Sequence, residues 1–400
     1  MRYDLVFEGG GAKGMVFVGA IQALEAQGYS VARLLGTSAG AISACLLAAG
    51  YTADEMLAAL DEKSNGKPVF AGFLGAPVPV SDASVEASTL VQLMRKVDLP
   101  FVSETAEQRI GTAIVRWMAS HDTLRHLFSF IELGGWYSAD PFVEWITARL
   151  NFGTVAGAPR RYGSMTLGEF YAATEKDASF VASDTTGGNM LILNHRTAPG
   201  VPVAWAVRMS MGIPLLWQEV TWKNEWGAYR GTDITGHTVV DGGLLSNFPI
   251  ELLASRDPNV MALMGEQAGG ALLGFLIDED AEVPGAPPPP PAKASRFAQI
   301  PAVTRMSNLL NTMLEARDRR VIEALANMVV RLPAKDYGTA EFDITDARKD
   351  CLIQSGRAVT ARYLESRVAH RSFSGTEEEE PMSPRARAAA TQCAAKILGF

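Results

Sequence analysis

The sequence predicts an α/β protein in which a central, mostly parallel sheet carries helices on both faces. Two observations predict it: short apolar runs alternate with helical stretches at the start of the chain, and similar apolar runs return in its second half. The chain has 400 residues, of which 48% are hydrophobic and 20% charged. This composition is typical of soluble globular proteins and permits a large core, in one large domain or two ordinary ones.

The first 50 residues are predicted to form a βαβα unit. An apolar run at 4–7 stops at three glycines, and a helical pattern with Phe17, Ile21 and Leu24 on one face follows it. A second apolar run at 31–35 leads through a glycine turn into a small-residue helix at 39–49. Such units imply parallel strands with helices packed on the sheet.

Residues 54–149 lack the apolar runs typical of strands, so we interpret them as a helical insertion and a possible lid. Helices are predicted there at 86–96 and 104–120. Within this region, the uncharged segment 68–80 is either a lid that meets acyl chains or a loop packed on the insertion. Strand patterns return later in the chain, at 180–182, 190–193 and 238–240.

The C-terminal part begins with a proline-rich segment at 284–292 that includes five consecutive prolines, which usually marks a linker or a surface loop. Helices are predicted beyond it, at 303–328 and 347–368. Residues 371–400 form an acidic and then basic-amphipathic tail that we expect to lie outside the folded core of 1–370. That tail either binds an anionic membrane surface or is merely solvated.

Charge and residue usage exclude several classes of protein. The formal net charge of −8 argues against a general nucleic-acid binder, so a lipid partner must be met by apolar surface or a local basic patch. The three cysteines are widely spaced, and no His, Asp or Glu cluster has ligand spacing; we therefore expect no disulfide framework, no metal and no cofactor. Without an apolar run of about 18 residues or a signal-peptide pattern, we expect a cytoplasmic protein, the alternative being a specialised secretion system.

The stretch Gly36-Thr37-Ser38-Ala39-Gly40 fits a nucleophile elbow, in which a serine sits on a sharp strand-to-helix turn. The flanking glycines leave room for the strained backbone. On its own the pattern fits an ordinary glycine turn equally well, so the assignment of Ser38 as a nucleophile depends on two further motifs.

The first of these is a glycine loop ahead of a helix, Gly9-Gly10-Gly11-Ala12-Lys13-Gly14. Successive glycines can turn backbone N–H groups toward one anion. The loop also matches a dinucleotide-binding fingerprint, but the acidic residue expected after the second strand is missing. We therefore favour an oxyanion hole that includes Gly9, Gly10, Gly11 and Gly14.

The second motif is Asp241-Gly242-Gly243 at the end of an apolar run. An isolated motif of this kind is usually a turn cap, but beside the other two it supplies a candidate base. The chain has five histidines, and only His370 follows Asp241. A catalytic triad in the order Ser, acid, His, as in α/β-hydrolases, therefore fits the sequence poorly. His237 is favoured as a structural histidine. A Ser38–Asp241 pair is the simplest arrangement that fits.

These three motifs, in this order, make the chain resemble the bacterial branch of the patatin-like phospholipase family. Two further stretches extend the likeness, 206–214 and 244–249, and weaker similarity continues to about His370. The resemblance implies one patatin-like domain of three layers that includes the proline-rich loop. It also implies catalysis by Ser38 and Asp241 through an acyl-enzyme, with backbone N–H groups of Gly10 and Gly11 holding the oxyanion.

The function implied by the resemblance is lipid acyl hydrolysis of the phospholipase A or lysophospholipase type, with a phospholipid or other acyl lipid as partner and possible peripheral membrane contact. Several alternatives stay open: a signal-activated, membrane-degrading effector with the same chemistry, an acyltransferase or thioesterase, and a non-enzymatic binding module. The sequence does not decide the oligomeric state or the lipid class.

Overall fold

The predicted βαβα unit is present at the start of the chain. The computed structural model describes residues 2–64, 67–77, 82–94, 113, 115–117, 120–266, 269–289, 322–339, 341–374 and 382–400. In it the unit consists of β1 (Arg2–Phe7), α1 (Val16–Ala26), β2 (Ser30–Thr37) and α2 (Ala39–Ala48). A 3-10 helix, η1 (Gly11–Met15), occupies most of the glycine loop between β1 and α1.

The central sheet is mixed and mostly parallel, in the order β11-β12-β8-β2-β1-β13-β14, and β9 also pairs with β8. β1 lies near its middle, where Leu5 is aligned with Leu34 of β2 and Leu273 of β13. The antiparallel pairings gather at the β8 side. The remaining strands are β8 (Asp177–Asp184), β9 (Asn189–Leu193), β11 (Val220–Thr221), β12 (Thr238–Asp241), β13 (Ala271–Asp278) and β14 (Val329–Pro333).

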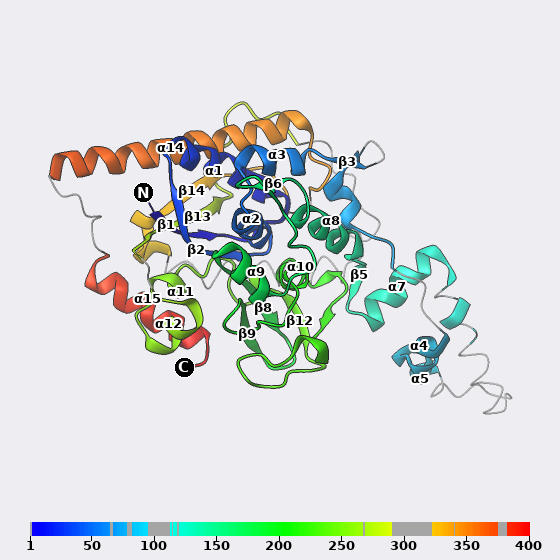
Figure 1. The fold of residues 1–400 in the computed structure, drawn as a ribbon. Helices are drawn as coiled ribbons and strands as arrows, with labels where there is room; N and C mark the ends of the chain where they lie inside the picture. Colours follow the sequence, from blue (N-terminus) through cyan, green and yellow to red (C-terminus); the bar gives the residue numbers. More distant parts are fainter. Residues whose placement is uncertain are drawn as a thin grey trace.

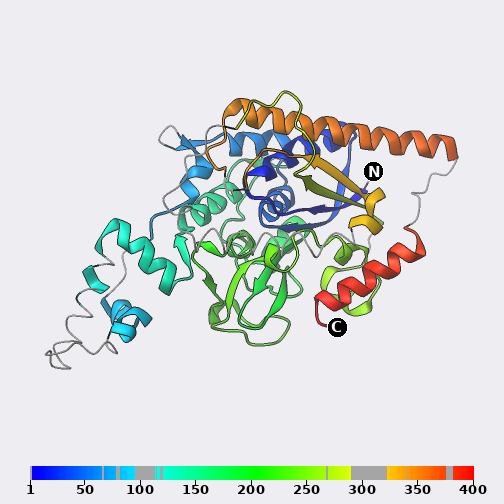
Figure 2. The ribbon, with the colours of Figure 1, turned by 180° about the vertical axis from the view of Figure 1, so that it is seen from behind.

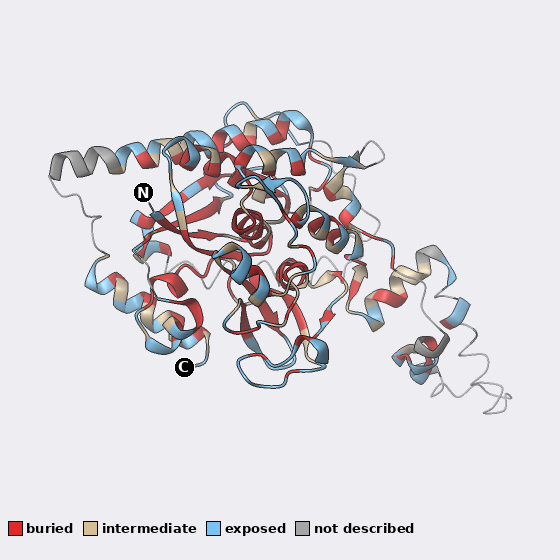
Figure 3. Cartoon of the chain, viewed as in Figure 1, coloured by how far each residue is buried: buried red, intermediate tan, exposed pale blue. Residues whose placement is uncertain are grey.

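Two hydrophobic cores, one on each face of the sheet, complete the three predicted layers (Figures 1 and 3). Side chains alternate along each strand, so Leu5 and Phe7 join the larger core and Val6 joins the smaller one. The helices of the larger core include α1, α2, α3 (Ala53–Leu60), α8 (Asp140–Leu150), α9 (Leu167–Thr174), α10 (Val203–Ser210) and α14 (Asp346–Ser374). The smaller core contains α11 (Glu251–Ala254), α12 (Pro258–Met264) and α15 (Pro384–Ile397).

The predicted insertion 54–149 is narrower in the structure. Its two ends, α3 and α8, pack in the larger core, as do Phe70 and Phe73 from the segment 68–80. Of the described elements, α4 (Asp82–Ala87), α5 (Thr89–Met94) and α7 (Asp122–Glu132) project from the body, around a small core that also contains Val115 (Figures 1 and 2). The predicted helix 86–96 is interrupted at Ser88, and most of 104–120 lies outside the described residues.

The prediction that residues 371–400 lie outside the folded core is wrong. α14 continues to Ser374, and after the undescribed residues 375–381 the chain returns as α15, which lies against α11 and α12 (Figure 2). Four residues on one side of α15 are buried in the smaller core: Ala386, Ala390, Ala394 and Ile397. The apolar face that a membrane-binding helix would use is therefore already covered by protein.

Of the two helices predicted near the C-terminus, the structure contains one and describes little of the other. The helix predicted at 347–368 is α14, whereas most of the helix predicted at 303–328 lies outside the described residues. β13 and β14 were not predicted. Shorter elements are β3 (Lys63–Ser64), β4 (Lys67–Pro68), η2 (Val69–Phe73), β5 (Gly135–Tyr137), β6 (Thr154–Val155), β7 (Ala158–Pro159), β10 (Leu215–Trp217), η3 (Asn224–Trp226), η4 (Gly242–Leu244) and η5 (Ala326–Met328).

Candidate active site

Ser38 occupies a strained turn between β2 and α2. Its φ of 52° and ψ of −119° give a non-glycine residue a positive φ, which costs energy and is common at active sites. The flanking glycines make the turn possible: a Cβ on Gly36 would lie 2.2 Å from the carbonyl oxygen of Gly40, and one on Gly40 would lie 2.2 Å from that of Phe7. The predicted elbow is therefore present in backbone geometry.

The C-terminal end of α10 holds both Ser38 and Asp241 by their main chains. The N–H of Ser38 donates to Oγ of Ser210 at 3.0 Å, and the N–H of Asp241 donates to the carbonyl of Gly212 at 3.0 Å. Ser38 follows β2 and Asp241 ends β12. The end of α10 and the residues after it therefore connect the ends of these two strands. This arrangement brings together two residues that are far apart in the sequence.

The carboxylate of Asp241 is buried, with 5% of the residue exposed. Its Oδ1 accepts a hydrogen bond from the N–H of Gly243 at 2.7 Å, so the glycine pair behind the acid fixes the carboxylate. Its Oδ2 is buried and has no partner in hydrogen-bonding geometry among the described residues. One carboxylate oxygen is thus held and the other is available to a neighbouring hydroxyl.

Burial raises the pKa of Asp241 to about 7, against the lowering effects of the Gly243 N–H, the Ser38 hydroxyl and the positive charge of Arg208. Arg208 is itself buried, and that burial lowers its pKa to about 10. An aspartate with an ordinary pKa is a weak base for a serine hydroxyl, and the raised value brings Asp241 into the range useful at neutral pH.

The glycine loop passes beside Ser38, but its four glycines differ in what they can donate. A Cβ on Gly9 would lie 3.1 Å from Cβ of Ser38, which places the loop against the nucleophile. The N–H of Gly9 donates to the carbonyl of Asn247 at 3.0 Å, so the prediction that Gly9 supplies an oxyanion donor is wrong. Gly14 faces the start of α2, where a Cβ would approach Ala39 to 2.6 Å.

Gly10 and Gly11 are the better candidates for the oxyanion hole. Neither of their N–H groups has an acceptor within the part of the chain that the structure describes. Gly11 has a φ of +54°, and a Cβ there would lie 2.1 Å from the carbonyl oxygen of Thr339. That same carbonyl accepts the N–H of Ala12 at 2.9 Å, so Thr339 fixes the turn that presents the two free amides.

Charged residues beside the loop stabilise it. Glu8 accepts hydrogen bonds from the N–H of Ile277 and from the side-chain amide of Asn247. Lys13 is buried and forms an ion pair with Glu279. Both side chains therefore tie the loop to the segments that flank it.

The histidines whose side chains are described form their contacts elsewhere. His237, the one closest to Asp241 in sequence, lies 2.8 Å from Oδ2 of Asp184 through Nδ1. His126 lies 2.7 Å from the carbonyl of Trp136. No group of three His, Cys, Asp or Glu residues that could hold a metal occurs among the described residues.

Ser38 lines a small apolar pocket. Its lining comes from the glycine loop, the start of α2, η2, the segment after α10 and the segment before α14: Gly11, Ser38, Ala39, Ile42, Phe70, Phe73, Met211, Ile213, Trp217 and Phe342. The sequence did not identify Ser210 or Thr339 as site residues. Ser210 lies within a stretch that carried the family resemblance, whereas nothing local marked Thr339.

The family model for patatin-like phospholipases matches residues 5–254, more than half of the chain, and includes all three motifs. The chain belongs to the patatin-like phospholipase family. At this coarse level, membership makes a lipid ester the expected type of substrate. The uncharacterized protein YqhO of Bacillus subtilis (strain 168) is 28% identical over 371 residues, which cover 91% of this chain and 98% of YqhO.

Two solved structures are also similar to this chain. VipD from Legionella pneumophila has a TM-score of 0.44 at 16% identity, over 91% of this chain and 67% of VipD. The type III effector ExoU of Pseudomonas aeruginosa has a TM-score of 0.41 at 18% identity, over 91% of this chain and 53% of ExoU, so the match spans about half of that chain.

The family match ends before two segments that complete the candidate site. Thr339 and Ile277 lie beyond residue 254, and both bond to the glycine loop or its flank. Among the described residues, no helix has both the length and the apolar character needed to cross a bilayer.

Proposed function

We propose that this protein hydrolyses acyl esters of lipids, in the manner of a phospholipase A or lysophospholipase, with Ser38 as nucleophile and Asp241 as its base. The observation that carries the proposal is the buried Asp241 carboxylate, which has one oxygen fixed by Gly243 and the other unpartnered beside the strained Ser38 turn. A free acceptor of raised pKa next to a serine is what nucleophilic catalysis without histidine requires.

In the first half of the reaction, Oγ of Ser38 bonds to the ester carbonyl carbon while its proton passes to Oδ2 of Asp241. The N–H groups of Gly10 and Gly11 stabilise the oxyanion. The tetrahedral intermediate then breaks the bond to the alcohol, which leaves with the proton from Asp241. The products of this half are an acyl-Ser38 ester and a free alcohol.

In the second half, a water molecule gives its proton to Asp241 and bonds to the acyl carbon. Collapse of the second intermediate releases the fatty acid, and Ser38 recovers its proton. Replacement of water by another alcohol or by a thiol at this step would make the same site an acyltransferase, so the nature of the acceptor is part of what the experiment must measure.

The proposal is tested by labelling with a fluorophosphonate and locating the label by mass spectrometry. We expect Ser38 to be modified, and we expect Ser38→Ala and Asp241→Asn to lose at least about a thousandfold in ester turnover. Asp184→Asn is the matched control, because Asp184 is also a buried acid of the sheet but pairs with His237. Near-normal turnover by either folded dyad variant would reject the assignment.

The same experiment separates constitutive from signal-activated hydrolysis. Immediate labelling in buffer supports a constitutive enzyme. Labelling that appears only with vesicles or with a protein activator supports the alternative of a regulated, membrane-degrading effector. Failure of Ser38 to react under all these conditions would support a binding module without catalysis.

A further inference from the structure

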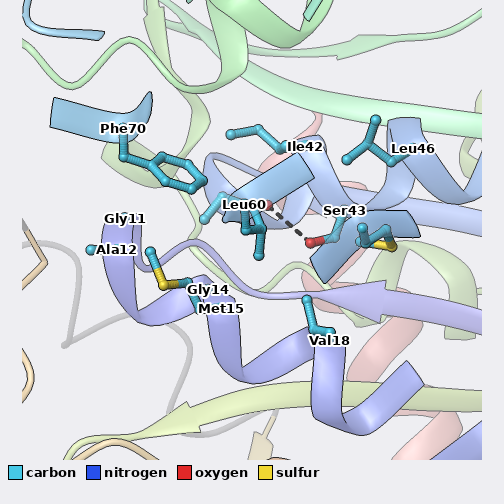
Figure 4. A pocket seen from close by; sticks show the side chains of 12 residues that line it. Gly11, Ala12, Gly14, Met15, Val18, Ile42, Ser43, Leu46, Leu60 and Phe70 are labelled. Carbon is cyan, nitrogen blue, oxygen red and sulfur yellow. Dashed lines mark hydrogen bonds between the residues drawn. The ribbon is translucent and has the colours of Figure 1, made fainter. Parts of the chain in front are cut away.

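The connection between β14 and α14, residues 334–345, lies beyond the residues that match the family model. It reaches the glycine loop, because the carbonyl of Thr339 accepts the N–H of Ala12 at 2.9 Å. Figure 4 shows Ala12 beside Gly11 at the start of η1, where both line a small apolar pocket. The same carbonyl oxygen would lie 2.1 Å from a Cβ on Gly11. The shape of this turn therefore depends on where the connection holds Thr339.

Glu341 fixes the part of the connection that carries Thr339. Its Oε2 accepts the N–H of Gly338 at 3.0 Å, and its own N–H donates to the carbonyl of Gly338 at 3.1 Å. Thr339 lies between these two residues in the chain, so the two bonds restrain its carbonyl. Only 15% of the Glu341 side chain is exposed, so its carboxylate needs a partner within the protein.

Arg348, in the first turn of α14, is that partner. Its Nε and Nη2 donate to Oε1 and Oε2 of Glu341 at 2.9 and 3.3 Å. Nη2 also donates to the carbonyl of Asp336 at 2.6 Å, and the guanidinium lies over Tyr337, 4.1 Å from the ring centroid. The Tyr337 hydroxyl donates in return to the carbonyl of Arg348 at 2.8 Å. One buried side chain thus holds the connection on both sides of Thr339.

The shape of arginine suits this role, because its planar guanidinium presents several donors at fixed angles. The remaining nitrogen, Nη1 of Arg348, donates to the carbonyl of Pro287 at 2.7 Å, so every nitrogen of the group has an acceptor. A lysine keeps the positive charge, but its single ammonium group cannot reproduce the paired bonds to Glu341 together with the bonds to both carbonyls. Arg348→Lys therefore tests the geometry of these contacts and not the charge.

We propose that Arg348 is a positioning residue, which fixes the two free amides of the oxyanion hole through Glu341 and the Thr339 carbonyl. The proposal rests on the hydrolase function proposed above. Donors stabilise an oxyanion best when they are in place before it forms, and misplacement by about 1 Å can cost about a hundredfold in rate. Release of the Thr339 carbonyl should therefore slow the chemical steps without weakening the binding of the ester.

The chain contains a matched control in Arg160, whose surroundings repeat those of Arg348. Arg160 is also 1% exposed, donates two bonds to the carboxylate of Glu55 and lies over Tyr51, 4.1 Å from the ring centroid. Its other acceptors are backbone carbonyls just beyond α2 and α8. These groups lie at the opposite end of α2 from Ser38, so Arg160→Lys should lower the Tm without disturbing the oxyanion turn.

The kinetic test measures kcat and KM for p-nitrophenyl butanoate. Arg348→Lys should lower kcat at least about tenfold and leave KM within about twofold of wild type, because both halves of the reaction pass through an oxyanion. Glu341→Gln should act in the same direction, and it keeps the test informative if the lysine variant fails to fold. Arg160→Lys should keep kcat within about twofold of wild type. Equal losses of kcat at Arg348 and Arg160, or a loss carried by KM alone, would overturn the proposal.

Hydrogen exchange followed by mass spectrometry examines the same turn without turnover. In Arg348→Lys, peptides covering residues 9–15 should exchange at least about tenfold faster than in wild type, because the bond from Ala12 to Thr339 opens more often. In Arg160→Lys the same peptides should exchange at the wild-type rate. Unchanged exchange in Arg348→Lys, beside a wild type that hydrolyses esters, would reject this inference alone. Absence of all hydrolysis by the wild type would instead reject the proposed function.

Discussion

The main-chain N–H of Ser38 donates a hydrogen bond to Oγ of Ser210 at 3.0 Å, in a site where both residues are buried. Because the N–H of Asp241 bonds to the carbonyl of Gly212 two residues further on, one short piece of chain spaces the proposed nucleophile and its base. Loss of the Ser210 hydroxyl should therefore affect the reaction as well as the stability of the fold.

We expect Ser210→Ala to lower kcat about tenfold and to destabilise the fold by about 1–3 kcal/mol, because it leaves a buried N–H unpaired next to a strained residue. Ser179→Ala is the control, since Ser179 is also buried but accepts its hydrogen bond from Asn194. Ester kinetics and urea unfolding measure the two effects. A normal kcat in Ser210→Ala would show that the turn holds its shape without this bond.

The pH profile follows from the pKa of Asp241, which burial raises to about 7. A base must be ionised to accept a proton, so kcat/KM for a soluble ester should rise with pH and reach half its maximum near pH 7. Arg208→Met should move this midpoint to higher pH, because the positive charge of Arg208 lowers the pKa of Asp241. A profile that is flat between about pH 5 and 8 would exclude Asp241 as the base.

Asp241→Asn should stabilise the protein at alkaline pH. Because the folded state raises the pKa of Asp241 from 3.8 to about 7, the stability that depends on its proton is complete below pH 3.8 and is lost as pH rises through 7. The asparagine variant should gain up to about 4 kcal/mol over wild type at pH 8, and the gain should shrink toward pH 4. Urea denaturation of both proteins at pH 8 and pH 4 measures this difference in the free energy of unfolding. A variant less stable than wild type at pH 8 would contradict the prediction.

The backbone of Ser38 predicts an order of stability among inactive variants. Its φ of 52° is strained for any residue with a Cβ, and glycine relieves that strain while adding flexibility to the unfolded chain. The free energy of unfolding of Ser38→Gly should therefore exceed that of Ser38→Ala by about 1 kcal/mol, and Ser38→Gly should unfold at a higher urea concentration. Equal stabilities would mean that the turn stores little strain.

The packing of α15 is tested by placing a charge on its buried side. Ala394→Asp should lower the free energy of unfolding by about 3 kcal/mol or more, because Ala394 is fully buried in the smaller core. Ala388→Asp is the control on the exposed side of the same helix and should change stability by less than about 0.5 kcal/mol. Equal effects from the two variants would contradict the observed packing.

Local patterns predicted the part of the fold that local forces determine. Alternating apolar runs and glycine turns marked β1, α1, β2 and α2, and the elbow geometry at Ser38 follows from its neighbouring glycines. The run 271–278, which forms β13, is as apolar as these strands but was not predicted as one. The tail was mispredicted because its buried residues are mostly alanines, whose small apolar surface gives a weak periodic signal.

Long-range pairings in the site were beyond local prediction. The sequence predicts that Gly9 donates to an oxyanion, but its N–H donates to the carbonyl of Asn247 instead. Sequence spacing does not predict a hydrogen bond between segments so far apart. Thr339 is a similar case, since its carbonyl meets Gly11 and Ala12 only because β13 and β14 place it there. Tertiary contacts of this kind decide which of several chemically equal amides stay free.

The contact between Thr339 and the glycine loop also has a consequence for synthesis of the chain. The ribosome delivers Ser38 and Asp241 long before residue 339, at about 5–20 residues per second. Until then the turn that presents Gly10 and Gly11 lacks the carbonyl that fixes it, and β1 lacks its neighbour β13. Under the proposed mechanism, a nascent chain that already carries both dyad residues would therefore lack a fixed oxyanion turn until Thr339 has folded against the glycine loop.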